Sequence, residues 1–305
     1  MFINNPDPYL LPSYRISPFR TNDISNNLLF ERDNYASYYF DNRFGANNWN
    51  FIKNGREGIN IVLKSYNLLP SDIVTILTTT QNFYISSCVT KQIEEICNWN
   101  REIVSGTKLL FVNHEFGYPY PEMEMLKKLN IPIIEDCCTT FFSQDDNLNV
   151  GKYGDFSIYS FPKFFPIQIG GLIVKNKEQD NLESSKIVND EIIYIENVMS
   201  YYLKNENQLL KSRKEIYDYT VSKYSKYGFT ERLATVQNFY PTSFLFNNNS
   251  IINDLPKLKI YLLNHGIQSS VFYGEDAFFI PCHQNLSHID VDYILNCIIS
   301  FKKMQ

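Results

Sequence analysis

The stretch Ser160-Phe-Pro-Lys163-Phe-Phe-Pro-Ile-Gln-Ile-Gly170-Gly171 places one lysine in a run that otherwise predicts a buried segment. Aromatic residues and prolines stand on both sides of Lys163, and a Gly-Gly pair lets the backbone turn closely into the next strand. Burying an ammonium group is unfavourable unless the group is paired, neutralised or used covalently. The stretch therefore predicts a buried lysine with a specific chemical task.

The composition indicates a folded protein with a sizeable core. The chain has 305 residues, of which 44% are hydrophobic and 15% aromatic, enough for one large and one smaller domain or two medium ones. The net charge of −5 and the lack of basic clusters argue against nucleic acid as the main partner. No apolar run approaches the roughly 20 residues of a membrane-spanning helix. The N-terminal segment shows no signal-peptide pattern, so we expect a cytoplasmic protein without membrane contact.

The cysteines and histidines show no metal-binding spacing. The six cysteines contain no C-x-x-C pair, and the four histidines are scattered along the chain. We therefore expect reduced thiols and no bound metal.

Hydrophobic periodicity between residues 54 and 174 predicts helices that alternate with strands. Apolar residues at positions i, i+3, i+4 and i+7 after Asn54-Gly55 predict a helix that begins at this step. This alternation is typical of an α/β domain with a mostly parallel sheet. Strands are expected at residues 73–77, 108–112, 131–134, 156–161 and 171–174, and helices at residues 56–66, 88–99 and 121–129.

The C-terminal part of the chain has a different pattern. Long polar helical patterns cover residues 191–219, and helices at 251–265 and 290–301 flank a strand expected at 267–272. We predict an N-terminal arm and a large α/β domain over residues 1–185, and a smaller α+β domain over residues 186–305. The first 45 residues or so lack clear periodicity and predict an irregular arm.

Three polar features are expected at the carboxyl ends of strands, where ligands bind in open α/β sheets. They are Glu135-Asp136, Asn113-His114-Glu115 and Lys163. Taken alone, the first is equally well a charged pair that starts a loop, and the second a structural histidine. The Asn54-Gly55 step adds a helix N-terminus, which can bind a phosphate. No G-x-G-x-x-G or Walker pattern is present, which disfavours nucleotide binding of those types.

Taken together, these residues suit one cofactor, pyridoxal 5'-phosphate (PLP). A lysine whose pKa is lowered by an apolar site can form a Schiff base with an aldehyde. An aspartate can hold the pyridine nitrogen protonated, a helix N-terminus can hold the phosphate, and an aromatic residue such as Phe83 can stack on the ring. The spacing of these residues leaves other interpretations open.

A series of short motifs runs in order from Asn54 to the C-terminal part of the chain. The most specific are Ile133-Ile-Glu-Asp136, Val150-Gly-Lys-Tyr-Gly154-Asp155, and Tyr159-Ser160-Phe161 followed by Lys163 and Gly170-Gly171. The others are Asn54-Gly55-Arg56, Leu69-Pro-Ser-Asp72, Asn82-Phe83-Tyr84, His114-Glu-Phe-Gly117-Tyr-Pro119 and Ile280-Pro281-Cys-His283-Gln-Asn-Leu286.

These motifs resemble V-I-E-D, V-G-x-x-G-D, F-S-F…K…G-G and L-P-x-H-P-x-L-T of the DegT/DnrJ/EryC1/StrS sugar aminotransferases. The resemblance implies the PLP-dependent transferase fold of aspartate aminotransferase (fold type I). It also implies transfer of an amino group from an amino acid, for which we expect glutamate, to a keto sugar nucleotide in surface polysaccharide biosynthesis. Members of the family are homodimers with the active site at the subunit interface, so a homodimer is expected.

The resemblance also implies a role for individual residues. Lys163 would bind the cofactor covalently and shuttle protons, and Asp136 would hold the pyridinium. Phe83 would stack on the ring, Thr139 stands where the family usually has Gln or His beside the ring, and His114 would lie near the substrate. The expected phosphate contacts are Gly55, Arg56 and Ser160.

The chain departs from the family pattern in several places. The segment from Ser160-Phe161 to Lys163 is two residues shorter than the usual S-F-x-x-x-K, and Arg56 replaces a threonine. The R-x-x-G loop after Gly170-Gly171 and the N-Y-R-M segment are missing. These departures predict a shortened, divergent member. They leave open a degenerate fold-type-I protein that binds a ligand or partner without catalysis, and a different PLP-dependent reaction such as dehydration or decarboxylation.

Overall fold

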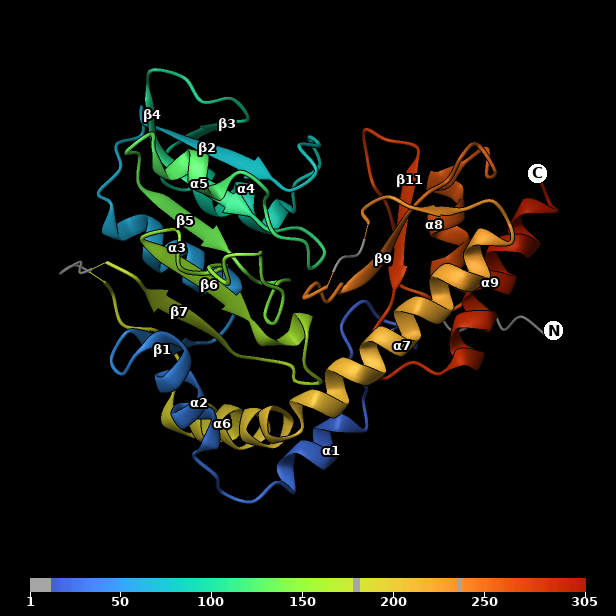
Figure 1. Ribbon diagram of the computed structural model, residues 1–305, viewed down its shortest axis with the longest axis horizontal. Helices are drawn as coiled ribbons and strands as arrows, with labels where there is room; N and C mark the ends of the chain where they lie inside the picture. Colours follow the sequence, from blue (N-terminus) through green and yellow to red (C-terminus); the bar gives the residue numbers. More distant parts are fainter. Residues whose placement is uncertain (1–11, 178–181, 235–236) are drawn as a thin grey trace.

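A seven-stranded sheet forms the larger part of the protein. The computed structural model describes residues 12–177, 182–234 and 237–305 (Figure 1). The strand order is β1-β7-β6-β5-β4-β2-β3, and only β7 runs antiparallel to its neighbours. This confirms the expected α/β fold with a mostly parallel sheet. The strands are β1 (Trp49–Ile52), β2 (Ile73–Thr78), β3 (Asn98–Asn100), β4 (Thr107–Asn113), β5 (Ile133–Asp136), β6 (Phe156–Ser160) and β7 (Gly171–Lys175).

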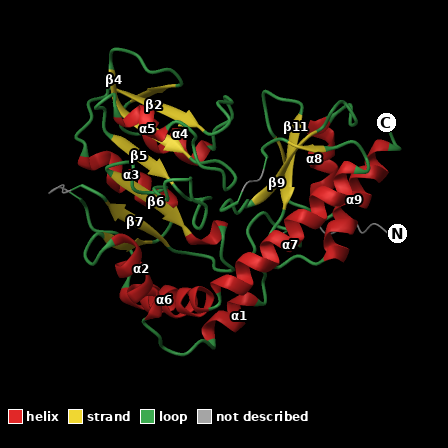
Figure 2. Ribbon diagram, viewed as in Figure 1, coloured by secondary structure: helices red, strands yellow, loops and turns green. Residues whose placement is uncertain are grey.

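Both faces of this sheet are covered by helices, as Figure 2 shows. Leu109 and Phe111 of β4 pack against α3 (Gly55–Ser65) and α4 (Ser87–Glu94). Leu110 and Val112, which alternate with them, pack with α5 (Met123–Lys127). Since both faces are buried, β4 is a continuous apolar run rather than an alternating one, as parallel strands usually are.

A second layer of helices covers the β6–β7 end of the sheet. α2 (Tyr35–Phe44) and α6 (Asn189–Lys204) pack there around the rings of Phe40 and Phe161, whose centroids are 5.9 Å apart. α1 (Asp23–Leu28) lies beside α6. Residues 12–45 therefore contain α1 and α2 instead of the irregular arm that we expected, and residues 1–11 of that arm lie outside the described residues. The helical period of α2 is hard to see in the sequence. Its aromatic residues lie on several faces of the helix, because the protein packs against it on several sides.

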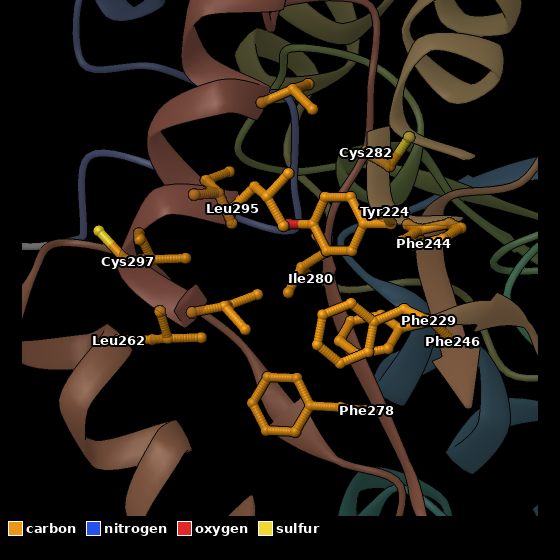
Figure 3. Close-up of a cluster of buried hydrophobic side chains, with 14 of the residues drawn as sticks. Tyr224, Phe229, Phe244, Phe246, Leu262, Phe278, Ile280, Cys282, Leu295 and Cys297 are labelled. Atoms are coloured by element: carbon orange, nitrogen blue, oxygen red, sulfur yellow. The ribbon is translucent and has the colours of Figure 1, made fainter. Parts of the chain in front are cut away.

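The C-terminal part contains an antiparallel four-stranded sheet of order β10-β11-β9-β8. Figure 3 shows its core, where Tyr224, Phe244, Phe246 and Phe278 point toward one another. The long helix α7 leads from α6 to this sheet (Figure 1). The elements are α7 (Glu206–Ser225), β8 (Thr230–Glu231), β9 (Ser243–Asn247), α8 (Leu255–Asn264), β10 (Ser270–Val271), β11 (Ala277–Pro281) and α9 (His288–Lys302).

Several expected element boundaries are wrong. The helix expected at residues 88–99 ends at Glu94, because Asn98–Asn100 pairs with β2 as an edge strand. The helical pattern at residues 191–219 is interrupted at Asn205, which separates α6 from α7. β5 extends through Glu135 and Asp136, so these carboxylates belong to the strand itself. None of the described helices is long and apolar enough to span a membrane.

The described N-terminal segment is anchored on the C-terminal part of the chain. Tyr14 exchanges backbone hydrogen bonds with Gly266 and Gln268 at 2.9 and 2.8 Å. His283 is buried, and its Nε2 lies 3.0 Å from the carbonyl oxygen of Arg15. Its Nδ1 accepts from the backbone N–H of Asn285 at 3.3 Å, so Nε2 carries the proton and donates to Arg15. A neutral imidazole thus ties the N-terminal segment to the loop after β11.

This contact predicts an acid-sensitive stability. Burial lowers the pKa of His283 to about 3, whereas an unfolded histidine titrates near ~6.5. Between these values only the unfolded chain binds the proton, so stability is lost as the pH falls below about 6.5. We expect the His283 contribution to be about 2 kcal/mol smaller at pH 5 than at neutral pH. Urea unfolding at pH 7.5 and pH 5 measures the difference.

His283→Gln keeps one donor and one acceptor at this position and should remove most of that pH dependence. Equal slopes in wild type and His283→Gln would contradict the assignment.

Candidate functional site

The parallel strands bring the predicted site residues to one edge of the sheet. Asp136 ends β5, and Ser160 ends the neighbouring β6. A single 3-10 turn, Phe161–Lys163, follows β6 directly. The N-terminus of α3 lies at the same edge, because a Cβ atom added to Gly55 would stand 3.5 Å from Cβ of Ser160. Four predicted residues, Asp136, Ser160, Lys163 and Gly55, therefore share one site.

A buried carboxylate, Glu135, holds this edge together. Its side chain is fully buried; Oε1 accepts from the N–H of Gly154 at 2.7 Å, and Oε2 from the N–H of Gly151 at 2.9 Å. Oε2 also lies 3.1 Å from His114 Nε2. His114 Nδ1 accepts a hydrogen bond from the N–H of Tyr120 at 2.8 Å. The ring proton is therefore on Nε2, which donates a hydrogen bond to Glu135. Glu135 thus links β4, β5 and the loop that enters β6.

This geometry corrects the expectation that His114 lies near the substrate. The His114 ring is completely buried, and both of its nitrogens are already engaged. His114, Glu135 and Cys137 also place their ligand atoms within 4.8 Å of one another, as a metal site would. Hydrogen bonds account for the first two, and burial raises the pKa of the Cys137 thiol well above its ordinary value, which disfavours the thiolate that a metal needs.

Asp136 presents a carboxylate in a poorly solvated position. Its side chain is buried, and Oδ1 accepts from the N–H of Cys138 at 3.1 Å. Burial raises the pKa of Asp136, while the hydrogen bond from Cys138 and the positive charge of Lys163 act in the opposite direction. A cationic partner at this carboxylate would relieve its desolvation, and a protonated pyridine nitrogen is such a partner.

Lys163 lies in the turn with its side chain exposed, so the prediction of a buried lysine is wrong. The aromatic neighbours Phe161, Phe164 and Phe165 are buried, but the tight turn that they anchor directs the lysine itself outward. Among the described residues, none accepts a hydrogen bond from its ammonium group or pairs with it. Burial raises the pKa of Asp136 and of Cys138, and the positive charge of Lys163 only partly opposes that rise.

The close approach of β6 and β7 explains the Gly-Gly pair behind this turn. A Cβ atom on Gly171 would lie 2.1 Å from the carbonyl oxygen of Tyr159, which no side chain tolerates. Gly170 has a φ of +102°, in the region that favours glycine. Its carbonyl oxygen accepts from the N–H of Phe161 at 3.0 Å and so closes the Lys163 turn from behind.

The N-terminus of α3 forms a small cradle with Ser160 and Cys138. A Cβ atom on Gly55 would stand 3.0 Å from Cys138 Sγ, so only glycine fits without displacement. The Asn54 side chain caps Glu57 N at 3.1 Å. The N–H groups of Gly55 and Arg56 and the hydroxyl of Ser160 have no acceptor or donor partner within the described part of the chain. Unused donors at a helix N-terminus suit a phosphate. The Arg56 side chain is exposed beside this cradle.

Phe83 and Thr139, which were expected beside the cofactor ring, have different surroundings in the structure. Phe83 is 80% exposed in the loop after β2 and packs on no other ring of the described residues. Its neighbour Tyr84 packs instead, with its ring centroid 5.5 Å from that of Phe272. Thr139 donates to the carbonyl oxygen of His114 at 2.6 Å and accepts from the N–H of Gly117 at 3.3 Å. Its hydroxyl therefore orders the turn after β4.

Sequence reasoning gave no role to Glu135, Cys138, Arg213 or Gln284. A signal for Glu135 was present, since the glycines of the Val150–Asp155 motif supply N–H groups that need an acceptor. Cys138 and Arg213 lie outside the quoted motifs, and the Ile280–Leu286 motif that contains Gln284 does not show where its side chain points. Only the fold brings Arg213 and Gln284 to the carbonyl oxygen of Phe164, beside Lys163.

Comparison with known proteins shows similarity to a family over part of the chain. The model of the DegT/DnrJ/EryC1/StrS aminotransferase family matches residues 92–188, which include Asp136, Ser160 and Lys163. GDP-perosamine synthase of Escherichia coli O157:H7 is 26% identical over 160 residues. The part of the chain that carries the candidate site is therefore similar to this family. The aligned part is 45% of this chain and spans only 44% of the length of the synthase.

Solved structures of DegT/DnrJ/EryC1/StrS-type and related aminotransferases share the fold. The aminotransferase TlmJ from Streptoalloteichus hindustanus superposes with a TM-score of 0.72 at 15% identity, over 93% of this chain and 94% of TlmJ. A sugar aminotransferase from Streptococcus pneumoniae in its PLP-form superposes with a TM-score of 0.66 at 14% identity, over 94% of this chain and 98% of its own. The expected fold type I is therefore confirmed across nearly the whole chain.

The Glu135 network predicts a large stability effect. Glu135→Gln leaves one acceptor oxygen for three donors and turns an amide N–H toward a backbone N–H. We expect a loss of about 2–3 kcal/mol in the free energy of unfolding, the usual penalty for unpaired buried polar groups. Urea unfolding measures it. Glu124→Gln on the exposed side of α5 is the matched control and should change stability by less than about 0.5 kcal/mol. Equal effects of the two substitutions would refute the central role of Glu135.

Proposed function

We propose that this chain is a PLP-dependent aminotransferase that moves an amino group from an amino acid, with glutamate as donor, to a keto sugar nucleotide used in surface polysaccharide synthesis. The observation that carries this proposal is the position of Lys163, an amine without a partner among the described residues, in the turn after β6, the strand that pairs with the end of β5 at the buried Asp136. Similarity to the aminotransferase family over residues 92–188 supports the reaction class, and the PLP-form of a protein with the same fold supports the cofactor.

The residues at the sheet edge suit this cofactor. Asp136 would keep the pyridine nitrogen protonated, because a buried carboxylate gains most from a cationic neighbour. Gly55 and Arg56 would offer backbone N–H groups to the phosphate, and Ser160 its hydroxyl. When bound, PLP supplies an aldehyde for amines and a ring that accepts electrons. Lys163 would hold it covalently and, once released, carry a proton to and from the substrate carbon.

A homodimer is part of the proposal. In a single chain the amine of Lys163 and the ring of Phe83 are both exposed to solvent. Exclusion of water strengthens the electrostatic interactions on which such chemistry depends. A second copy placed over this edge would provide that exclusion and would bury Phe83 at the same time.

A second candidate function is ligand binding without catalysis. It is favoured by two observations, the engaged hydroxyl of Thr139 beside the expected ring position and the exposure of Phe83 away from other rings. The two functions differ in one reaction. A catalyst converts glutamate to 2-oxoglutarate with PLP in a single half-reaction, whereas a binding protein leaves glutamate unchanged.

The covalent role of Lys163 can be tested by trapping. We expect purified protein with PLP to develop visible absorption, and borohydride reduction to attach a pyridoxyl group to the peptide that contains Lys163, as mass spectrometry would detect. Lys163→Ala should abolish both signals. Lys152→Ala, which removes another exposed lysine, should retain them. Attachment elsewhere, or equal attachment in Lys163→Ala, would rule out the assignment.

The role of Asp136 predicts a rate effect without loss of attachment. Asp136→Asn removes a charge-assisted hydrogen bond worth roughly 1.5–3 kcal/mol. We therefore expect the half-reaction with glutamate to slow by about tenfold to a hundredfold, while Lys163 still traps PLP. An unchanged rate in stopped-flow absorbance would show that Asp136 does not act on the cofactor.

A further inference from the structure

Arg213 of α7 is a fully buried cation that the proposed chemistry does not yet use. Its side chain has no exposed surface, and no carboxylate of the described residues forms an ion pair with it. Burial lowers the pKa of Arg213 to about 9, which still leaves the guanidinium charged at neutral pH. A buried charge without a counter-ion is expensive, so its hydrogen bonds must provide a strong compensating interaction.

Those hydrogen bonds converge on the Lys163 turn. Nη2 of Arg213 donates to the carbonyl oxygen of Phe164 at 3.1 Å, and Nη1 donates to that of Pro241 at 3.0 Å. The guanidinium carbon also stacks over the Phe164 ring, 3.9 Å from its centroid. Phe164 is the residue that directly follows Lys163. Arg213 therefore holds the turn by a hydrogen bond to the carbonyl group of the residue that follows the proposed catalytic lysine.

Gln284, from the loop after β11, binds the same carbonyl oxygen of Phe164. Its Nε2 donates to the same carbonyl oxygen of Phe164 at 3.0 Å, and its Oε1 accepts from Arg213 Nη2 at 2.5 Å. Gln284 occupies the position at which the resembling motif L-P-x-H-P-x-L-T has its second proline, a residue whose side chain cannot donate or accept a hydrogen bond. The carbonyl of Phe164 thus receives two donors from two distant segments.

The turn itself has little internal support. It is a single 3-10 turn, Phe161–Lys163, whose closure depends on Phe164 N and Phe165 N donating to the carbonyl oxygen of Phe161 at 3.0 and 2.8 Å. Short 3-10 turns have poor hydrogen-bond geometry and are weak when isolated. The segment is also two residues shorter than the S-F-x-x-x-K pattern, so the lysine must reach the site from a tighter turn.

We propose that Arg213 and Gln284 are positioning residues for Lys163, and that they hold the shortened turn in the conformation that presents the amine to Asp136. They act through the carbonyl of Phe164 and touch neither cofactor nor substrate. This inference rests on the proposed role of Lys163. It also links the small sheet to the amine, since Arg213 comes from α7 and Gln284 from the loop between β11 and α9.

The test compares Gln284→Met and Arg213→Lys with wild type. Gln284 is partly exposed, so Gln284→Met removes its hydrogen bonds with little risk to folding. Arg213→Lys keeps the charge but loses the fork that serves two carbonyls. Gln208→Met, on an exposed face of α7, is the matched control. Two quantities are measured: hydrogen exchange of the Phe164 and Phe165 amides in PLP-free protein, and the equilibrium constant for covalent attachment of PLP to Lys163.

We expect each positioning variant to speed exchange of the two amides and to weaken attachment of PLP. For Gln284→Met the effect should be roughly fivefold or more, because this variant loses a neutral hydrogen bond to the Phe164 carbonyl and a charge-assisted one from Arg213. Gln208→Met should change neither quantity. Unchanged exchange in both variants would overturn the grip on the turn, and faster exchange with unchanged attachment would overturn the positioning of Lys163. If wild type attaches no PLP, the proposed function fails, and amide exchange alone then decides whether Arg213 and Gln284 hold the turn.

Discussion

The buried carboxylate of Glu135 holds together the segments that carry the candidate site. It accepts hydrogen bonds from Gly151 N, Gly154 N and His114 Nε2, and no water reaches it. A buried polar group in this position is stable because both of its oxygens accept hydrogen bonds. Asp136 is the next residue, and the loop with the two glycines leads into the strand that ends at Ser160. The relative placement of Asp136, Ser160 and Lys163 therefore depends on this one network.

The two ionisable groups of the site, Asp136 and Lys163, differ in their exposure to solvent. Asp136 is buried, so a cationic partner stabilises it, whereas Lys163 is exposed and unpaired within the described residues. The turn that carries Lys163 is supported from outside by Arg213 and from behind by Gly170. A reactive amine thus sits on a short turn fixed by buried aromatic residues and by backbone hydrogen bonds, while its own side chain remains free to react.

The fold was largely predictable from the sequence where helices and strands alternate, because β2, β4, β6 and α3 have clear apolar periods and sharp ends. The edge strand β3 and helices α1 and α2 were missed, since their short or aromatic-rich sequences have no period that separates helix from strand. At the site, the sequence predicted polar residues at the carboxyl ends of strands, and the fold places Asp136, Ser160, Gly55 and Lys163 at one edge of the sheet, while their roles stay predictions. The exposure of Lys163 could not be predicted from its apolar neighbours, because the turn buries their rings and leaves the amine in solvent. Arg213 has no local signal, and the motif that contains Gln284 does not show that its side chain reaches the Phe164 carbonyl.

The most direct test of this account is a crystal structure of the protein with PLP. The account predicts continuous density between Lys163 Nζ and the cofactor, the Asp136 carboxylate at hydrogen-bond distance from the pyridine nitrogen, and the phosphate at Gly55, Arg56 and Ser160. A cofactor bound away from Asp136, or a Lys163 side chain directed away from a cofactor that Asp136 holds, would contradict it.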